Sequence, residues 1–585
     1  MQFPGPSELL EAIQTWRPEA RAELKKHLAD HGLSVTSDAE AKLREAEALA
    51  AHRIDPRVTL QQAEHFGVLA RAALALVPAR QTMGTGFTRL VDAKFRLDAH
   101  TVRGLSTAVS NPTELLSAIE DGPPTGETAW LRPATPLELV ASLVRHLALD
   151  AGTSLKLTLD AALSQWLEER LRDTSVPLLR AAGGAGLFIA NVASAFREVD
   201  ALFLSANDVP KEIAERFSER VKLLRRDGQS ATPASSIDAS AGPSTNYCAE
   251  YARCEFDIGG ERHFALRWPA RLGEQTSARA LGARRGGRVI LSTPSEFEPG
   301  FADLSPDTLR QWGARLDVLY WAGCHYYTVD SPGVAKQKTE RLVQGFQHMR
   351  EGNPALWNHF EYVSPRNPAN ERVVLEALVG VCDSVDINST EAEAILKRLD
   401  ANAPLGHPTG TPWVREWNLA ENPATMLSLA LALKSALGVR QIQLHGLLGD
   451  VVVSDFDALP SPERAVLALF RARQMASNKA ANKTGEIKTP EDFWPVWPGA
   501  GHRGLVGAQL FADAVAARFG LSEALRGEVL SKCFFRDARA ALILMFVPNR
   551  GMHFIEGGTT GAGDTIGAGF QLFWPSDRVR PMRTR

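Results

Sequence analysis

A glycine-rich segment near the C-terminus places the strongest constraint on how this chain folds. It follows the apolar run Ala540–Val547, which has the length of a buried strand and is closed by Pro548-Asn549. Residues 559–566, with the sequence Thr-Thr-Gly-Ala-Gly-Asp-Thr-Ile, then predict a loop of small residues that opens into a helix. A strand, loop and helix of this kind can gather backbone N–H groups around an anion at the helix N-terminus.

Asp564 is the unexpected residue of this segment. A carboxylate would repel a phosphate that merely rests in the loop. It suits a base that takes the proton from a hydroxyl group attacking a phosphorus atom. The structural alternative is a glycine-rich turn that only joins a strand to a helix, because turns are rich in glycine. The segment alone leaves both interpretations open.

Two better-known glycine motifs do not fit the segment. The spacing Gly561-x-Gly563-x-x-x-Gly567 is one residue longer than the dinucleotide-binding fingerprint, and it lies too late in the chain for the acidic residue expected about 20 positions on. A P-loop would need Gly-Lys-Ser or Gly-Lys-Thr, which the chain lacks.

Composition excludes several classes of protein. With 585 residues the chain is long enough for a large core and a second lobe, and its formal net charge of −3 gives no basic excess for nucleic acid. Its five cysteines include no Cys-x-x-Cys pair, so neither a disulfide framework nor a structural zinc site is indicated. No leader pattern begins the sequence, and no run approaches the roughly 18 apolar residues of a membrane span. We therefore expect a soluble cytoplasmic protein that binds neither nucleic acid nor membrane.

The chain divides into a helical block and an α/β domain. Residues 1–80 are rich in Ala, Leu, Glu and Arg at helical spacing, which predicts a helical N-terminal extension. From residue 81 to 585, runs of strand length alternate with helical patterns, as in a doubly wound parallel sheet flanked by helices. Residues 84–98 alternate as one strand, and the Lys- and Asn-rich residues 477–488 are expected to form a loop.

The glycine-rich segment and several other motifs resemble the ribokinase-like sugar kinases, and most closely their branch of ADP-dependent glucokinases and phosphofructokinases. Residues 559–566 resemble the late Gly-x-Gly-Asp helix start of that family, and His359-Phe360-Glu361 resembles its His-x-Glu magnesium motif. The resemblance runs from about Gly84 to the C-terminus. The further matches are Asn388-x-x-Glu391, the strand Gln441–His445 that ends in His, and the turn Gly183-Gly184 before Ile189-Ala190-Asn191.

This resemblance implies an α/β, ribokinase-like fold, with a small β-containing lid formed from parts of about 84–130 and 230–300. Asp564 would be the catalytic base, and the N–H groups of Gly561, Ala562 and Gly563 would stabilise charge on the transferred phosphoryl group. The resemblance also implies sugar binding by Asp92, Gly183 and Gly184, with Glu250, Arg285 and Arg288 at the rim of the sugar site. The other implied roles are nucleotide binding by His445, Pro548 and Asn549, and magnesium binding by Glu361, Asn388 and Glu391, with His359 orienting.

Two positions depart from the family pattern. The family has Asn two residues before the sugar-binding Asp and Asn or Gln after the paired glycines, whereas this chain has Leu90 and Ala185. Both changes remove polar contacts to a sugar. Asn388 and Glu391 also match a helix N-cap with an acid at the third helical position, which needs no metal.

The leading hypothesis is a kinase that transfers the terminal phosphoryl group of ADP to a sugar hydroxyl with Mg²⁺, giving a sugar phosphate and AMP. Glucose is the default acceptor, and fructose 6-phosphate or another sugar-like acceptor is the alternative. A hypothesis of a different class is a non-catalytic ligand-binding relative that has lost sugar phosphorylation. The expected partners are thus a small sugar and a nucleotide, and the sequence leaves the oligomeric state open.

Overall fold

The fold is known from a computed structural model, which describes residues 56–109, 112–121, 132–149, 155–205, 207–240, 244–251, 254–255, 282–283, 287–293, 304–324, 331–363, 368–378, 380–399, 422–446, 448–481, 502–549 and 562–575. Most of the expected helical extension 1–80 lies outside these residues. Its described part contains helix α4 (Pro56–Leu74), which packs on the C-terminal half of the chain. Gln474 Nε2 donates to Ala70 O of this helix over 2.7 Å.

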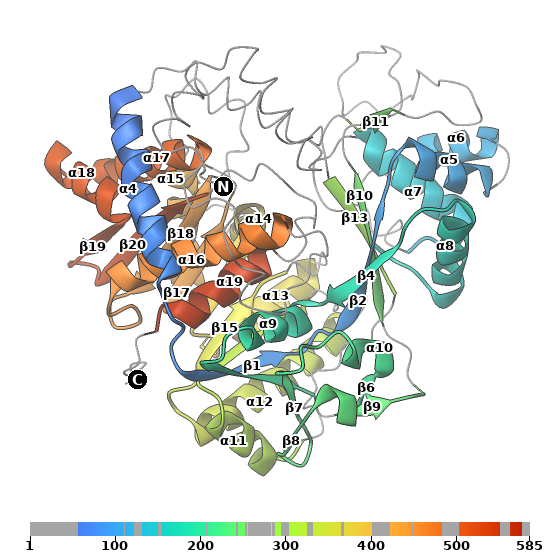
Figure 1. The fold of residues 1–585 in the computed structure, drawn as a ribbon, viewed down its shortest axis with the longest axis horizontal. Coiled ribbons are helices and arrows are strands. Elements are labelled where there is room, and N and C mark those ends of the chain that lie inside the picture. The colour runs from blue at the N-terminus through green and yellow to red at the C-terminus, as the bar shows by residue number, and fades with distance from the viewer. Residues whose placement is uncertain are drawn as a thin grey trace.

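The larger of two main sheets forms the centre of the fold (Figure 1). In the described residues it has eleven strands in the order β19-β20-β18-β17-β16-β15-β14-β1-β5-β7-β8. Every pairing from β17 across to β7 is parallel, and the pairings that add β18, β20, β19 and β8 are antiparallel. The strands are β1 (Gln81–Gly86), β5 (Val199–Leu204), β7 (Lys222–Leu224), β8 (Ser230–Ala231), β14 (Val318–Trp321), β15 (Trp357–Glu361), β16 (Ser384–Asn388), β17 (Gln441–His445), β18 (Gly449–Asp455), β19 (Phe534–Asp537) and β20 (Leu542–Pro548).

Helices cover both faces of this sheet, which confirms the expected doubly wound α/β architecture. On one face α9 (Ala185–Ser194), α19 (Ala562–Phe573) and α16 (Pro462–Ala481) lie side by side, with α4 against α16. The other face carries α12 (Pro332–Gly352), α13 (Pro368–Leu378), α14 (Ser389–Leu399) and α15 (Pro423–Leu437). The remaining helices of this part are α10 (Lys211–Ala214), α11 (Pro306–Ala314), α17 (His502–Phe519) and α18 (Glu523–Lys532).

A second sheet, in the order β3-β13-β10-β2-β4, forms a smaller unit beside the first (Figure 1). Ala93, Phe95, Tyr247 and Ala249 of this small sheet pack against helices α5 to α8 in a core of their own. The alternate residues of the same strands point to the opposite face, because side chains alternate along a strand. The elements are β2 (Leu90–Arg96), β3 (Leu155–Thr158), β4 (Leu179–Gly183), β10 (Thr245–Tyr251), β13 (Gly287–Ser292), α5 (Ala99–Thr107), α6 (Pro112–Asp121), α7 (Pro136–Leu149) and α8 (Ala161–Asp173). Two short strand pairs join β6 (Val209–Pro210) to β9 (Ile237–Asp238) and β11 (Cys254–Glu255) to β12 (Gly282–Ala283).

The expectation of one strand across residues 84–98 is wrong. Gly86, at the end of β1, pairs with Trp321 in the large sheet, whereas Val91 of β2 pairs with Thr245 in the small sheet. The chain therefore crosses from one sheet to the other between these strands. Alternation of side chains predicts strands but not the sheet to which a strand belongs. Asp92 consequently lies in the small sheet.

The expectation of a loop across residues 477–488 is wrong for its first part. Helix α16 continues to Ala481, and its inward side chains there include Ala476, Asn478 and Lys479, all buried. Lys and Asn are usually exposed, so their abundance suggested a solvated segment. Packing of this helix on its neighbours buries them instead.

Helices α11 and α12 cross closely at glycine, which leads to a first prediction. A Cβ atom on Gly313 would overlap backbone atoms of Met349. Gly313→Ala should therefore lower the free energy of unfolding by about 1–3 kcal/mol, the usual cost of overpacking. Thermal unfolding followed by circular dichroism measures the change.

The matched control is Gly333→Ala in α12, where an added Cβ atom meets nothing within 4 Å. It should leave stability unchanged or raise it by up to about 1 kcal/mol, the helix-propensity difference between Gly and Ala. Equal destabilisation by both substitutions would contradict the packing explanation.

Candidate active site

The ends of three neighbouring strands and the start of one helix define the candidate site. β15 ends at Glu361, β16 at Asn388 and β17 at His445, all at one edge of the parallel sheet. Helix α19 begins beside this edge, since a Cβ atom added to Gly563 would lie 3.7 Å from Cδ2 of His445. This carboxyl edge is where doubly wound sheets bind their ligands.

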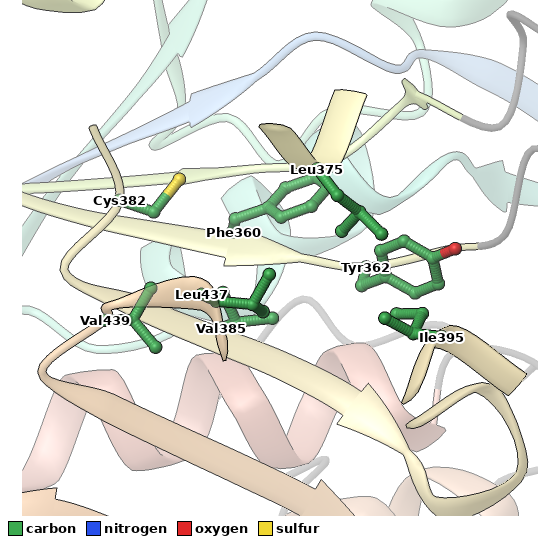
Figure 2. Close-up of a pocket in the computed structure, with 8 residues that line it drawn as sticks. All are labelled: Phe360, Tyr362, Leu375, Cys382, Val385, Ile395, Leu437 and Val439. Carbon is green, nitrogen blue, oxygen red and sulfur yellow. The ribbon is translucent and has the colours of Figure 1, made fainter. Parts of the chain in front are cut away.

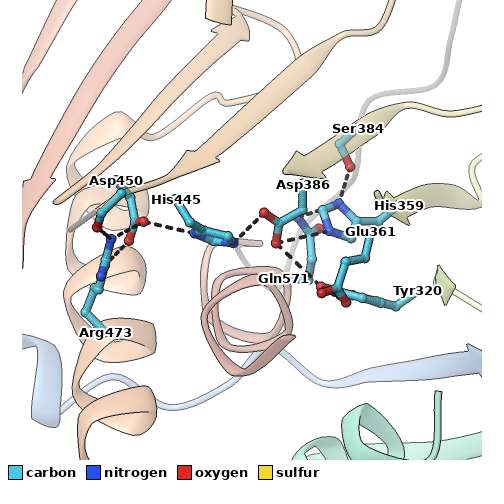
Figure 3. A network of polar contacts seen from close by, with 10 residues as sticks. Tyr320, His359, Glu361, Ser384, Asp386, His445, Asp450, Arg473 and Gln571 are labelled. Atoms are coloured by element: carbon cyan, nitrogen blue, oxygen red, sulfur yellow. Dashed lines mark hydrogen bonds and ion pairs between the residues drawn. The ribbon is translucent and has the colours of Figure 1, made fainter. Parts of the chain in front are cut away.

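A buried polar layer lies between the sheet and α19 (Figure 3). Because strand residues alternate, His359 and Glu361 point to the α19 side together with Ser384 and Asp386 of the next strand. Nδ1 of His359 lies 2.6 Å from Oγ of Ser384 and 3.3 Å from Nε2 of Gln571 on α19. These contacts hold the His359 ring under α19, and an orienting role of His359 in magnesium binding stays a prediction.

Glycines allow α19 to lie directly on this layer. A Cβ atom on Gly567 would overlap Oδ2 of Asp386 and the hydroxyl group of Tyr320. Toward α16, a Cβ atom on Gly569 would come within 2.9 Å of Cα of Ala472. Both glycines serve close packing rather than an unusual backbone conformation, and they fix the first turn of α19 at the strand ends.

Four charges of alternating sign run from α16 to the polar layer (Figure 3). Arg473 pairs with both carboxylate oxygens of Asp450. Asp450 Oδ1 lies 2.9 Å from Nδ1 of His445, whose Nε2 pairs with Asp386. We call Arg473, Asp450, His445 and Asp386 the charge ladder. Since all four side chains are mostly buried, the alternation of sign compensates charges that would otherwise be costly.

The two carboxylates of the ladder keep His445 protonated. Burial alone lowers the pKa of His445, but the charges of Asp386 and Asp450, and the hydrogen bonds to them, outweigh burial and raise it to about 10. Both ring nitrogens face a carboxylate, so the ring turns its carbon edge toward α19. Nucleotide binding by His445 stays a prediction, and it would use this edge.

Three carboxyl groups meet at the end of the ladder. The Tyr320 hydroxyl lies 3.3 Å from Oε2 of Glu361 and 3.5 Å from Oδ2 of Asp386. Burial, the charge of Asp564 and a hydrogen bond with Asp564 raise the pKa of Glu361 well above its usual range. Burial also raises the pKa of Asp386, against the opposing effect of His445. Glu361, Asp386 and Asp564 thus form a carboxylate cluster.

The carboxylate cluster suits a divalent cation. Carboxylate oxygens are ligands that Mg²⁺ prefers, and it commonly takes one or two of them while keeping several waters. Burial, followed by the charges of neighbouring carboxylates, raises the pKa values of Glu361 and Asp386, and a cation bound here would favour their ionised forms. Among the described residues, no group of three or more His, Cys, Asp or Glu side chains is already arranged around a metal position.

Asn388 and Glu391 form the cap that the sequence offered as the structural alternative. Asn388 Oδ1 accepts the backbone N–H of Glu391 over 2.8 Å at the start of α14. The capping contact accounts for this spacing without a metal. A role of the pair in magnesium binding stays a prediction.

Asp92 enters the site from the small sheet and is 6% exposed. Gly183 of the next strand lies against it, since a Cβ atom there would come within 2.5 Å of Asp92 Oδ1. The same added atom would overlap the side chain of Leu90, which is itself buried. Leu90 therefore packs on Gly183 as part of the core.

The charges around Asp92 come from both domains. Burial raises the pKa of Asp92 to about 6, with a further contribution from the charge of Asp564, while Lys94, Lys479 and a hydrogen bond with Asn246 oppose the rise. Lys94 and Asn246 belong to the small sheet, whereas Lys479 and Asp564 belong to helices α16 and α19. The small sheet therefore meets the large domain at the start of α19.

The paired glycines form the start of α9. Gly184 is its N-cap residue with φ of 78°, a left-handed conformation that favours glycine, and Ala185 is the first helical residue. Gly186 N donates to Thr88 Oγ1 over 3.0 Å, which fixes the crossing segment between β1 and β2. Sugar binding by this turn stays a prediction.

Glu250 and Arg288 lie on adjacent strands of the small sheet. They are direct partners in the antiparallel pairing of β10 and β13. Glu250 is four residues beyond Asn246, so both point to the same face as Asp92. The side chain of Arg288 and all of Arg285 lie outside the described part of the chain.

Pro548 and Asn549 lie at the same sheet edge as His445. Pro548 pairs with Gly449, and Asn549 N donates to Leu448 O over 2.8 Å. Nucleotide binding by Pro548 and Asn549 stays a prediction. In the predicted anion loop Ala562, Gly563 and Asp564 begin α19, and Gly561 lies outside the described residues.

An apolar cavity lies on the other face of the same strands (Figure 2). Its volume is about 10 Å³, far below the roughly 300–1,000 Å³ of ligand pockets, so it is a packing gap. It confirms how β15 and β16 divide their side chains, since Phe360 and Val385 line it while His359 and Asp386 face α19. The lining residues are Phe360, Tyr362, Leu375, Cys382, Val385, Ile395, Leu437 and Val439.

Sequence reasoning missed Tyr320, Asp386, Asp450, Arg473 and Lys479. The pattern Ser-Val-Asp-Ile-Asn of β16 carried a usable signal, because polar residues alternating with apolar ones in a strand covered on both faces mark a buried polar layer. The same holds for Gln-Ile-Gln-Leu-His of β17. Arg473 and Lys479 lie on a helix whose charged residues gave no such indication.

Solved structures share this fold. An ADP-dependent kinase in complex with fructose-6-phosphate and ADPβS superposes with a TM-score of 0.65 over 91% of this chain and 100% of that one, at 16% identity. A hypothetical ADP-dependent phosphofructokinase from Pyrococcus horikoshii OT3 gives 0.59 over 85% and 98%, at 20% identity. The last common ancestor of ADP-dependent phosphofructokinases from Methanosarcinales gives 0.59 over 89% and 98%, at 17% identity. The resemblance inferred from the motifs is thus confirmed at the level of the fold.

No family model matches the sequence, and no curated protein matches it either. Within the described residues, none of the helices combines the length and the apolar character needed to cross a membrane.

The charge ladder leads to a second prediction. Arg473→Met would leave Asp450 buried beside Asp386 with His445 as their shared cation, so the free energy of unfolding should fall by about 3–5 kcal/mol. The control Arg536→Met breaks a pair with Glu463 at 3.6 Å in which both side chains are more than half exposed. It should change stability by less than about 1 kcal/mol. Similar small losses in thermal or denaturant unfolding would show that the ladder does not hold the fold.

Proposed function

We propose that the protein is an ADP-dependent sugar kinase, which transfers the terminal phosphoryl group of ADP to a sugar hydroxyl and releases AMP. The observation that carries the proposal is the convergence at Asp564. This carboxylate lies in the first turn of α19, contacts Glu361 at the sheet edge, and acts electrostatically on Asp92 of the small sheet. A base, a cation-binding carboxylate and a hydroxyl-binding carboxylate would thus meet at one helix N-terminus.

Asp564 suits the role of base in this reaction. The acceptor oxygen forms a bond to the β-phosphorus of ADP, the bond from that phosphorus to the bridging oxygen breaks, and AMP leaves with the bridging oxygen. The proton of the acceptor hydroxyl passes to the carboxylate of Asp564. The backbone N–H groups of Gly561, Ala562 and Gly563, at the positive end of α19, would stabilise negative charge on the transferred group.

Glu361 would hold Mg²⁺. Asn388 ends the neighbouring strand β16, and it and Glu391 would contact the water ligands of the ion. When bound, the ion neutralises phosphate charge during transfer. The Tyr320 hydroxyl, which lies within 3.5 Å of both carboxylates, connects Glu361 to Asp386 and so to the charge ladder. The ladder would favour the ionised form of Asp386, because His445 beside it opposes the rise in pKa that burial causes.

Asp92 would bind the acceptor. An ionised carboxylate accepts hydrogen bonds from two neighbouring hydroxyl groups. Because Gly183 has no side chain, it leaves room beside Oδ1 of Asp92. Glu250 lies further along the same face of the small sheet. The similar solved structures named as phosphofructokinases favour fructose 6-phosphate as the acceptor over glucose, the default from sequence.

A coupled assay tests the proposed function. Purified protein with Mg²⁺ is given ADP or ATP and, in turn, fructose 6-phosphate, glucose and other sugars, and AMP formation is followed. We expect AMP only with ADP and a sugar acceptor. No AMP with any sugar, together with binding of ADP in calorimetry, would instead favour the non-catalytic relative.

Removal of the base gives a third prediction. Asp564→Asn should lower kcat by about 10²–10⁴, the usual contribution of a positioned general base, while ADP binding stays nearly unchanged. Asp457→Asn, at a carboxylate that is 66% exposed, is the matched control and should keep full turnover. Unchanged kcat in Asp564→Asn would remove this residue from the reaction.

Removal of the cation ligand gives a fourth prediction. Glu361→Gln should shift the Mg²⁺ dependence of activity to higher concentration by about tenfold or more and affect the acceptor KM less, because its proposed partner is the ion. The control Glu376→Gln changes a glutamate that is 58% exposed and paired with Arg372. A magnesium titration that superposes on the wild-type curve would exclude Glu361 from the cation site.

A further inference from the structure

Lys479 is a buried cation for which the proposed reaction gives no role. It is 1% exposed, and its Nζ lies 5.1 Å from the centroid of the Phe188 ring. Burial of an ammonium group is costly unless nearby groups compensate it, and the Phe188 ring is one such group. A buried charge beside a candidate active site is therefore a candidate for function.

Helix packing places Lys479 beside the start of α19. Helices α16 and α19 run antiparallel, because Arg464 near the start of α16 donates to Phe573 O at the end of α19, and Ala472 lies against Gly569. Lys479 follows Ala472 by seven residues, which is two helical turns on the same face. On α19, the residues two turns before Gly569 form the first turn of the helix, which contains the proposed base Asp564.

The Phe188 ring connects Lys479 to the acceptor side. Phe188 belongs to the first turn of α9, which begins directly after Gly183-Gly184. Gly183 in turn lies against Oδ1 of Asp92. The ammonium group thus lies where α16, α9 and the small sheet meet, and its charge lowers the pKa of Asp92.

We propose that Lys479 is a positioning residue that reaches from the large domain toward Asp92 and holds this carboxylate in the ionised form that an acceptor sugar needs. The inference rests on the proposed function for its role in sugar binding. A protonated carboxyl group loses acceptor capacity toward sugar hydroxyls. Without nearby cations, a carboxylate as buried as Asp92 would take up a proton closer to neutral pH.

Other groups around Asp92 also change its pKa. Lys94, which is two residues along β2 and half-buried, lowers the pKa of Asp92 as Lys479 does, and so does the hydrogen bond with Asn246 of β10. The charge of Asp564 on α19 raises the pKa of Asp92. Lys479 differs from Lys94 because it belongs to the large domain, so its effect on Asp92 depends on how that domain contacts the small sheet.

The first test measures unfolding and needs no activity. Tm is compared for wild type, Lys479→Met, Asp92→Asn and the double variant at pH 7. Lys479→Met should lower Tm because it leaves a buried carboxylate with less compensation, and the double variant should unfold above Lys479→Met. Additive losses would overturn the proposal. If Lys479→Met is insoluble, Lys479→Gln takes its place.

The second test measures the pH dependence of kcat/KM for the acceptor. In wild type it should fall as pH drops through about 6, because Asp92 becomes protonated there. Lys479→Met should move this fall upward by about one pH unit, and Lys479→Arg should restore it. Lys434→Met is the matched control, since Lys434 pairs with Asp455 at 2.5 Å, and its profile should match wild type.

An unshifted profile in Lys479→Met would overturn the proposal even if Tm falls, since a purely structural lysine predicts that combination. Failure of the kinase proposal looks different. In that case wild type forms no AMP with any sugar, while the Tm comparison still reports the coupling between Lys479 and Asp92.

Discussion

The close contact of helix α19 with the buried polar layer of the sheet is the constraint on which the candidate site depends. Only a residue without a side chain fits at Gly567, where α19 lies on Asp386 and Tyr320. The contact sets the height of the helix above the sheet, and Gly569 sets its distance from α16. These two contacts together fix the position of Asp564, because it lies about one turn before Gly567 in the same helix. Gly567 and Gly569, which belong to the segment that suggested an anion loop in the sequence, therefore serve the close packing of the helix.

Close packing over a polar layer requires that the buried charges be compensated, and the charge ladder does this. Asp386 would be an isolated carboxylate under a helix if His445 did not pair with it, and His445 is held protonated by Asp450 on its other side. Arg473 ends the series on α16. Apart from His445, whose carbon edge would face the nucleotide, the side chains of the ladder have no direct contact with a substrate in the proposed reaction. They allow a cluster of three carboxyl groups to exist at the sheet edge without a disordered or water-filled core.

The sequence predicted the doubly wound α/β fold and strands such as those at 441–445 and 540–547. Local signals sufficed there, since apolar runs and turn residues each report on their own neighbourhood. The placement of Glu361 and Asp564 in one site came from the resemblance of their motifs to a kinase family. The sequence did not predict which sheet holds Asp92, because residues 84–98 alternate without a break while the pairing partners change from Trp321 to Thr245. Nor did it predict Lys479 as buried, because only tertiary packing decides whether a lysine on a helix faces water. The errors thus concern contacts between elements far apart in the chain.

The burial of Asp92 is explained only by both domains together. Helices α5 to α8 cover the face of the small sheet opposite to Asp92, so within the small unit alone its side chain would lie on an uncovered face. Yet Asp92 is only 6% exposed, and groups of α16 and α19 act on its charge. The large domain therefore provides its cover. In the proposed reaction, a sugar bound to Asp92 would have to replace that cover with its own hydroxyl groups. The contact between the domains that buries Asp92 is for this reason the same contact that would bring an acceptor hydroxyl toward the proposed base Asp564.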